Sequence, residues 1–74
     1  MNLCDLKIGE SAVIESVNLP GIKKHRLYDL GFIKGEKVKK VYNSSFGNPV
    51  CYFIKNSFIA LRNNDASFIE VRYE

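Results

Sequence analysis

The alternation of hydrophobic and polar positions divides most of the chain into short runs rich in Val, Ile and aromatic residues. Such runs, separated by Gly, Pro, Asn and Ser, are typical of β-strands joined by tight turns. The runs are residues 11–17, 36–42, 50–54, 58–61 and 68–71. In the second run the apolar spacing slips between Val38 and Val41, three positions apart instead of two, which predicts a bulge or a sharp bend.

The segments between these runs carry turn signals. Asn56 and Ser57 separate two runs and predict a tight hairpin, because Asn tolerates positive φ. Residues 43–49 form a loop rich in Asn, Ser and Gly, and residues 63–66 are short and polar enough to hold one helical turn. The pattern therefore predicts mainly β structure with short connections.

Residues 22–30 follow a helical period instead. Ile22, Leu27 and Leu30 fall within one arc of about 140° at 3.6 residues per turn, and we expect that arc to face the core. Gly31 follows at once, and glycine takes the left-handed conformation that ends a helix without a Cβ clash. These positions predict one short helix inserted between the first two strands.

Arg26 lies in the middle of that apolar arc, where a guanidinium is costly unless it finds an acceptor. Asp29 is three residues further along the helix, and a carbonyl of a neighbouring strand is the other acceptor within reach. We expect Arg26 to make a fold-specifying polar contact with one of the two.

Five short strands around one small helix predict a small, strongly bent β-barrel. Closure of the barrel protects strand edges that a flat sheet of this size would expose. Gly9 and Gly35 each precede a strand, as corner residues of such barrels do. The 74 residues leave room for one domain over residues 1–74, and a domain of this size is marginally stable.

Positive charge is concentrated in one part of the chain. The formal net charge is +3, but residues 23–40, the basic segment, alone carry +5 and the remaining residues carry −2. This segment suits an acidic protein surface, the anionic inner leaflet of a membrane or a nucleic acid, or it serves only as a solvated face. Its charged residues are Lys23, Lys24, Arg26, Lys34, Lys37, Lys39 and Lys40, against Asp29 and Glu36.

Residues suited to catalysis are few. His25 is the sole histidine, no serine stands in a G-x-S-x-G turn, and the glycines are scattered singly instead of clustering to cradle a phosphate. Enzymatic activity is therefore not expected. Cys4 and Cys51 form no C-x-x-C pair, and we expect two reduced thiols.

The N-terminal residues lack the basic start and the apolar stretch of a secretory signal. The longest apolar run, residues 50–54, is far below the roughly 20 residues needed to cross a bilayer as a helix. We therefore expect a cytoplasmic protein without a membrane-spanning segment.

A metal site has two weak candidate ligands. His25 and Asp29 are four residues apart on the same exposed face of the predicted helix, as two ligands would be. Two ligands do not complete a site, and nothing in the spacing requires Cys4 or Cys51 to join them. Binding of ferrous iron or zinc is thus the alternative to an ordinary solvated helix face, and no cofactor is expected.

Several short motifs follow one another over nearly the whole chain. They are Arg26-Leu27-Tyr28-Asp29-Leu30-Gly31-Phe32, then Gly35, then Phe46-Gly47-Asn48-Pro49, then Ile59-Ala60-Leu61-Arg62 and residues 66–71. In order and spacing they resemble the FeoA family of bacterial ferrous-iron transport proteins. The opening of the chain, residues 3–9, is similar to that family as well.

The resemblance implies an SH3-like β-barrel with one inserted helix and no catalytic activity. It also implies a cytoplasmic accessory role at the inner membrane, beside FeoB, the membrane GTPase and permease that takes up ferrous iron. The helix 23–30 and the loop 46–49 are the implied contact surfaces. The partner-binding residues are then Lys23, Lys24, His25, Tyr28, Lys39, Phe46 and Asn48. The structural motif is carried by Arg26, Leu27, Asp29, Leu30, Gly31, Gly35, Gly47, Pro49 and Arg62.

Two positions depart from the family pattern. Asn56 replaces the glycine usual at its hairpin, and Asn48 replaces the common aspartate of its loop. Turns with positive φ tolerate both changes. The resemblance supplies no obligatory metal ligands for this chain.

A second interpretation comes from another class of protein. The same small barrel occurs as the C-terminal domain of iron-dependent repressors related to diphtheria toxin repressor, and small basic barrels bind nucleic acid. A repressor also needs a helix-turn-helix domain, for which 74 residues leave no room. Stacking on bases needs exposed aromatic side chains, and the expected ones are Tyr28, Tyr52 and Phe46. The aromatic side chains expected in the core are Phe32, Phe53 and Phe68.

Overall fold

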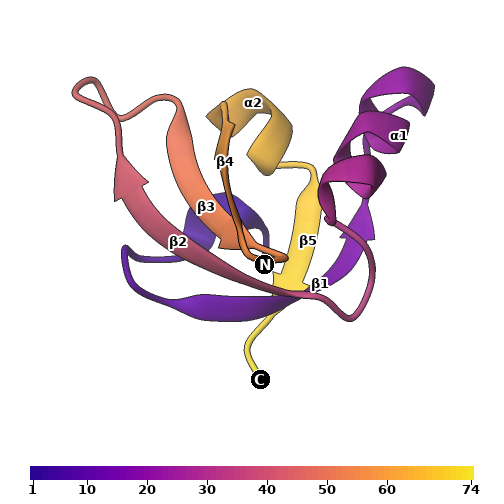
Figure 1. Ribbon diagram of the computed structural model, residues 1–74, viewed down its shortest axis with the longest axis horizontal. Coiled ribbons are helices and arrows are strands. Elements are labelled where there is room, and N and C mark those ends of the chain that lie inside the picture. The colour runs from indigo at the N-terminus through magenta and orange to yellow at the C-terminus, as the bar shows by residue number, and fades with distance from the viewer.

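The computed structural model describes residues 1–74 and contains one antiparallel sheet of five strands in the order β4-β3-β2-β1-β5. The sheet is strongly bent, so that its strands curl around a common interior (Figure 1). The expected mainly β architecture with a short inserted helix is confirmed, and no helix is both long and apolar enough to span a membrane. The elements are η1 (Leu3–Asp5), β1 (Ser11–Val17), α1 (Gly21–Leu30), β2 (Lys37–Asn43), β3 (Val50–Ile54), β4 (Ser57–Leu61), α2 (Asn63–Ala66) and β5 (Ile69–Arg72).

Two bulges bend the strands. In β2 the register against β3 shifts between Lys40 and Tyr42, which confirms the irregularity predicted near Val41. In β1 the register against β5 shifts between Ile14 and Ser16, and the hydrophobic spacing of that run does not predict this second bulge. A bulge bends its strand and increases the local twist, so these two irregularities help a small sheet to curl.

The turn between β3 and β4 lies one residue earlier than predicted. Lys55 and Asn56 have φ angles of 51° and 61°, and two successive positive φ angles are typical of a type I′ hairpin turn. Ser57 is already the first residue of β4, opposite Ile54 in β3. The turn therefore uses Lys55 and Asn56 instead of Asn56 and Ser57.

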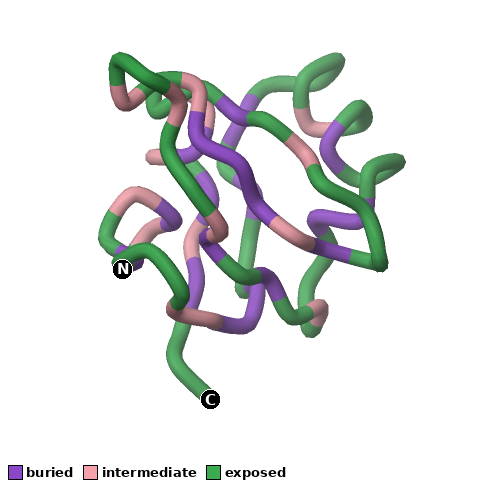
Figure 2. The backbone as a smooth tube through the Cα atoms, turned by 60° about the vertical axis from the view of Figure 1, so that its left-hand side comes forward, coloured by how far each residue is buried: buried purple, intermediate pink, exposed green.

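The core fills the inside of the curled sheet (Figure 2). Alternate residues of the strands point inward, and Leu3 and Leu6 of the N-terminal segment join the same cluster. The two largest fully buried side chains are Tyr52 and Phe32. The prediction for Phe32 is therefore confirmed.

The aromatic predictions for Tyr52 and Phe68 are wrong. Tyr52, predicted as an exposed stacking residue, is fully buried because it shares the inward face of β3 with Val50 and Ile54. Phe68, predicted in the core, is 50% exposed, because the inward position at the start of β5 belongs to Ile69. In both cases the pleat of the strand decides which side chain is buried.

α1 uses only one of its three predicted apolar contacts. Leu27 is buried, whereas Ile22 is 80% exposed and Leu30 is 38% exposed. The other anchors of the helix are Leu19 just before it and Phe32 just after it, and both are buried. The predicted arc is wrong for Ile22 and Leu30 because the residues that flank the helix supply these contacts.

The predicted polar contact of Arg26 is also wrong. Its side chain is exposed and forms neither a hydrogen bond nor an ion pair with Asp29 or with a strand carbonyl. Because the arc around Arg26 is itself largely open to solvent, water can hydrate the guanidinium group and no protein acceptor is required.

Lys40 is the one charged residue among the buried residues. Its Nζ donates to the carbonyl oxygen of Leu6 at 2.8 Å and to that of Cys4 at 3.3 Å. The Lys40 carbonyl accepts from the Gly9 N–H at 2.7 Å, and the Lys40 N–H donates to the Glu10 carbonyl at 3.0 Å. These bonds, the Lys40 clamp, hold the N-terminal segment against the middle of β2.

Tyr52 lies opposite Lys40 on the neighbouring strand. Its hydroxyl group is buried without a hydrogen-bond partner, and burial raises the pKa of Tyr52 well above the usual value. The phenol therefore stays neutral, and Lys40 remains the one charged side chain in this part of the interior.

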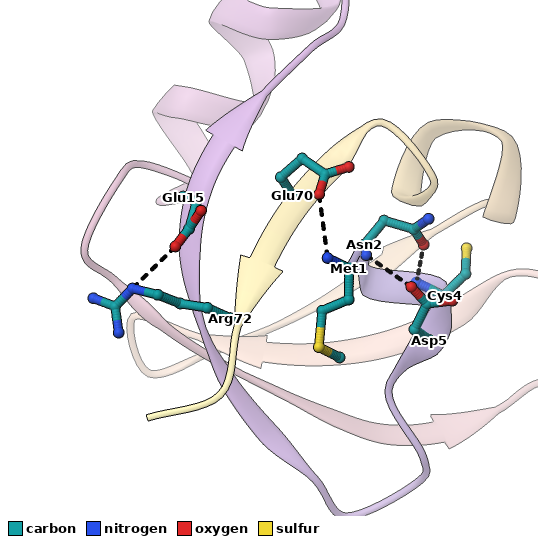
Figure 3. Close-up of polar contacts among 7 residues, drawn as sticks. All are labelled: Met1, Asn2, Cys4, Asp5, Glu15, Glu70 and Arg72. Atoms are coloured by element: carbon teal, nitrogen blue, oxygen red, sulfur yellow. Dashed lines mark hydrogen bonds and ion pairs between the residues drawn. The ribbon is translucent and has the colours of Figure 1, made fainter.

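The N-terminal segment also covers the outer edge of β5 (Figure 3). The Val71 N–H donates to the Met1 carbonyl at 2.8 Å, and Asn2 forms an isolated antiparallel β-bridge with Glu70. The N-terminal ammonium group lies 3.4 Å from Glu70 Oε2. Asn2 and Asp5 form a capping box that fixes η1, with the Asn2 N–H donating to Asp5 Oδ2 at 2.9 Å. β4 is the other end strand of the sheet, and no segment pairs with its outer edge.

Replacing Lys40 by Met is expected to destabilise the fold. Met keeps an apolar stem but leaves the carbonyls of Leu6 and Cys4 without a donor, and unsatisfied buried acceptors cost about 1–3 kcal/mol. Urea denaturation of Lys40→Met should show a free energy of unfolding lower by about that amount. The control Lys39→Met changes an exposed neighbour and should shift it by less than about 0.5 kcal/mol. Equal effects of the two substitutions would contradict the Lys40 clamp.

Candidate docking surface

A groove separates the C-terminal part of α1 from β4. Its volume is about 400 Å³, and half of its lining residues are hydrophobic. Tyr28, Leu30 and Ile33 keep between 37% and 39% of their surface exposed there. The residues that line this helix groove are Tyr28, Asp29, Leu30, Gly31, Ile33, Lys55, Ser57 and Ile59.

Gly31 joins the two walls of the helix groove. Its φ of 106° ends α1 in the left-handed conformation, as predicted, and the next N–H, of Phe32, donates to the Leu27 carbonyl at 2.9 Å. A Cβ added at Gly31 would lie 2.7 Å from Cγ of Lys55, so the stem of Lys55 packs directly on the glycine. The Lys55 ammonium group lies 3.2 Å from Glu36 Oε1.

A second apolar hollow lies on the opposite face of the sheet. It has a volume of about 270 Å³ and is lined by Lys39, Val41, Phe53 and Phe58, which we call the outer patch. The ring centroids of Phe53 and Phe58 lie 4.9 Å apart with their planes at 56°. Phe53, predicted in the core, is thus only half-buried, and it packs against the exposed Phe58.

β4 separates the helix groove from the outer patch. Ser57 and Ile59 line the groove, whereas Phe58 between them lines the outer patch. None of these three residues, nor Lys55, is among the partner-binding residues proposed from the sequence. The period-two alternation of residues 57–61 signals the two faces of the strand, but only the tertiary fold shows that α1 stands across from one of them.

The two contact surfaces implied by the motifs do not form one continuous face. Figures 1 and 2 show α1 and the β2–β3 loop on opposite sides of the molecule. On α1, His25 is exposed, Lys24 Nζ lies 5.8 Å from the centre of the Tyr28 ring, and Lys23 is paired with Asp65 at 3.2 Å.

In the β2–β3 loop, Phe46 is 96% exposed. The loop closes through the Gly47 N–H, which donates to the Ser44 carbonyl at 2.9 Å, and the Ser44 N–H, which donates to the Pro49 carbonyl at 3.1 Å. These bonds hold Phe46 at the exposed tip of the loop.

Asn48 makes a contact within the protein. Its Oδ1 accepts from the Asn63 N–H at 2.9 Å, which satisfies a donor at the start of α2. Arg62 precedes that helix, and its carbonyl accepts from the Ala66 N–H at 3.0 Å. The two residues therefore help to build α2, while Gly35 makes the turn before β2 with a φ of 93°.

Part of the basic segment is neutralised or buried. Lys23 pairs with Asp65, and Lys37 lies 3.6 Å from Glu74. Lys40, counted with the basic surface in the sequence, is buried instead, because it follows the inward-facing Val38 by two positions of the strand. Besides the buried Lys40, the basic side chains of the segment that form no ion pair are Lys24, Arg26, Lys34 and Lys39.

The candidate metal ligands remain two. His25 and Asp29 lie on the exposed part of α1, and no group of three or more His, Cys, Asp or Glu side chains comes together. Cys4 and Cys51 are free thiols, as expected. The Cys4 Sγ lies 3.6 Å from the Asn63 carbonyl oxygen, and burial raises the pKa of this thiol, so the neutral form is favoured.

Comparison with known proteins identifies the family. Residues 1–73 match the FeoA domain. The chain belongs to the FeoA family. It is 35% identical over 71 residues to a candidate Fe(2+) transport protein A of Campylobacter jejuni, and the alignment covers 96% of each chain. It is also 35% identical over 71 residues to a fusion of Fe(2+) transport protein A with the Fe(2+) transporter FeoB from Porphyromonas gingivalis, covering 96% of this chain and 8% of the fusion.

A solved FeoA structure shares the fold. FeoA of Stenotrophomonas maltophilia, complexed with zinc and described as an SH3 domain protein, superposes with a TM-score of 0.82 at 35% identity. The match covers 96% of this chain and 88% of that chain. The expected FeoA membership and the SH3-like barrel are therefore confirmed. In this FeoA-family chain, residues 28–31 of the longest motif also form one wall of the helix groove.

Gly31→Ala is expected to destabilise the protein more than Gly35→Ala. Both glycines have positive φ, 106° and 93°, so backbone strain of about 1–2 kcal/mol is common to the two substitutions. Only at Gly31 does a new Cβ meet a neighbour, Lys55. Thermal unfolding should show the larger fall in Tm for Gly31→Ala, and adding Lys55→Ala should recover most of the difference. The same Tm for both glycine variants would contradict the packing of Lys55 on Gly31.

Proposed function

We propose that this FeoA-family protein is a non-enzymatic accessory protein of ferrous iron uptake that docks on the cytoplasmic part of a FeoB-type transporter. The observation that carries the proposal is the Porphyromonas gingivalis relative, in which an FeoA-type sequence and FeoB share one polypeptide. Covalent linkage gives two modules a high effective concentration, which serves modules that work in contact. We propose that this chain makes the same kind of contact with a FeoB-type transporter.

The surface chemistry supports a docking role. The helix groove and the outer patch leave apolar side chains exposed on a small protein, and exposed apolar patches mark interaction sites. The basic segment contributes four side chains that form no ion pair, Lys24, Arg26, Lys34 and Lys39. They suit an acidic surface on the transporter or the anionic leaflet around it. The protein would therefore act at the cytoplasmic side of the inner membrane.

The dispersion of reactive groups supports a role without catalysis. His25 stands on the exposed face of α1, whereas Cys4 lies in η1 of the N-terminal segment and Cys51 is buried in β3. A nucleophile, its base and an orienting acid need mutual hydrogen bonds, and these residues come from separate parts of the fold.

Charge reversal in the basic segment is expected to weaken docking. Arg26→Glu combined with Lys34→Glu should reduce affinity for the full transporter in detergent about tenfold at low salt, because two exposed charge contacts are worth about 1.4 kcal/mol together. The difference should shrink as salt rises. The control, Lys7→Glu with Arg72→Glu, also reverses two exposed charges, but these lie outside the segment, and Arg72 is paired with Glu15. It should leave affinity within about twofold.

The readouts are co-purification with the transporter and ferrous iron uptake in cells that lack the gene for this protein. Failure to bind the full transporter, together with normal iron uptake after deletion, would contradict the proposed function. Retention on heparin and on single-stranded DNA at physiological salt, without transporter binding, would favour nucleic-acid binding instead.

A further inference from the structure

The outer edge of β4 is an uncovered sheet edge. β4 and β5 are the end strands of the sheet, and the N-terminal segment pairs with β5 (Figure 3). No segment of the chain pairs with the outer edge of β4. An unpaired edge strand offers a row of N–H and C=O groups to any strand that comes beside it.

The β3–β4 hairpin determines which peptide groups point outward. In a two-residue hairpin the residues that flank the turn exchange both hydrogen bonds, and bonded and non-bonded pairs alternate from there. Ile54 and Ser57 flank this turn, so Ser57 and Ile59 bond to β3. Phe58 and Ala60 therefore direct their N–H and C=O groups away from the sheet, and neither residue forms a backbone bond outside it.

β4 lacks the features that guard exposed edges in other proteins. Natural edge strands carry charged side chains, proline or bulges that discourage pairing. Residues 57–61 contain no charge and no proline, and their register against β3 is regular throughout. Positive charge stands only at the two ends, at Lys55 in the turn and at Arg62 after the strand.

Apolar hollows lie on both faces of this edge. The helix groove adjoins Ser57 and Ile59, and the outer patch adjoins Phe58. Side chains of an added strand would alternate between the two faces, as they do in any strand. One set would enter the helix groove beside Ile59, and the other would pack beside Phe58.

We propose that the outer edge of β4 is the docking site for an extended segment of the FeoB-type transporter, which adds to the sheet as a sixth strand. The inference rests on the proposed function and names the surface through which it acts. The outward peptide groups of Phe58 and Ala60 supply two donors and two acceptors for main-chain pairing. The segment that fits carries apolar side chains on both of its faces and an acidic residue at the end that meets Arg62.

Charge complementarity favours this occupant over a second copy of the chain. Lys55 is paired with Glu36, but Arg62 forms no ion pair, so one end of β4 offers an unmatched positive charge. Two copies paired antiparallel about Ile59 would place Arg62 of each copy opposite Asn56 of the other, and residues 55–62 contain no carboxylate that could pair with Arg62. A carboxylate at the end of a transporter segment would supply the ion-pair partner that Arg62 lacks.

Two substitutions test the edge. Ala60→Pro removes an outward N–H, and proline is tolerated on edge strands where the N–H faces solvent. Phe58→Lys places a charge on the open strand, the natural guard against pairing. Both should weaken binding to the full transporter in detergent at least tenfold. Phe68→Lys, a matched change of another exposed Phe, should leave binding within twofold. If the Ala60→Pro variant does not fold, binding by Phe58→Lys alone tests the edge site.

Amide hydrogen exchange of the full-length protein provides the direct readout. Protection of the Phe58 and Ala60 amides on adding the transporter supports the inference. Transporter binding without that protection, and undiminished in Phe58→Lys, overturns the edge site while leaving the proposed function intact. Absence of any binding overturns the proposed function itself. Protection that grows with concentration of this protein alone shows a second copy at the edge and likewise overturns the inference.

Discussion

The buried ammonium group of Lys40 joins the N-terminal segment to the middle of β2. It donates to the carbonyls of Leu6 and Cys4, and the Lys40 backbone bonds to Gly9 and Glu10. Removing a cation from water is costly, and the carbonyl acceptors offset that cost. The clamp fixes the N-terminal segment beside β2, from where its first residues reach across and pair with β5. One edge of the sheet is thereby covered, and the edge of β4 is left open.

That asymmetry connects the fold to the proposed docking. The open edge lies between the helix groove and the outer patch, so a strand added there would bury side chains on both of its faces. The longest family motif contributes through Gly31, whose missing Cβ lets Lys55 pack against the end of α1. The same glycine that ends the helix therefore also lets Lys55 pack beside it in the wall of the helix groove.

Local pattern was enough for the strands, the inserted helix, the bulge near Val41 and the family motifs, because each depends on neighbours in the sequence. It failed where tertiary packing decides. Lys40 lies two positions after the inward-facing Val38, which places its side chain toward the core. A lysine in a sequence is nevertheless expected at the surface, because the carbonyl groups that accept its hydrogen bonds are distant in the chain. Tyr52 and Phe68 exchanged their expected environments because the pleat of each strand, once its register is fixed, decides which side chain faces the core. The groove could not be foreseen, since its walls come from α1 and β4.

The claim that this FeoA-family protein works through the β4 edge is tested most directly by site-specific photocrosslinking in cells. A photoreactive amino acid is placed at Phe58 in one strain and at Phe68 in another, both exposed positions. The account predicts a covalent adduct with the FeoB-type transporter from position 58 and none from position 68. An adduct that forms from Phe68 but not from Phe58 would contradict it.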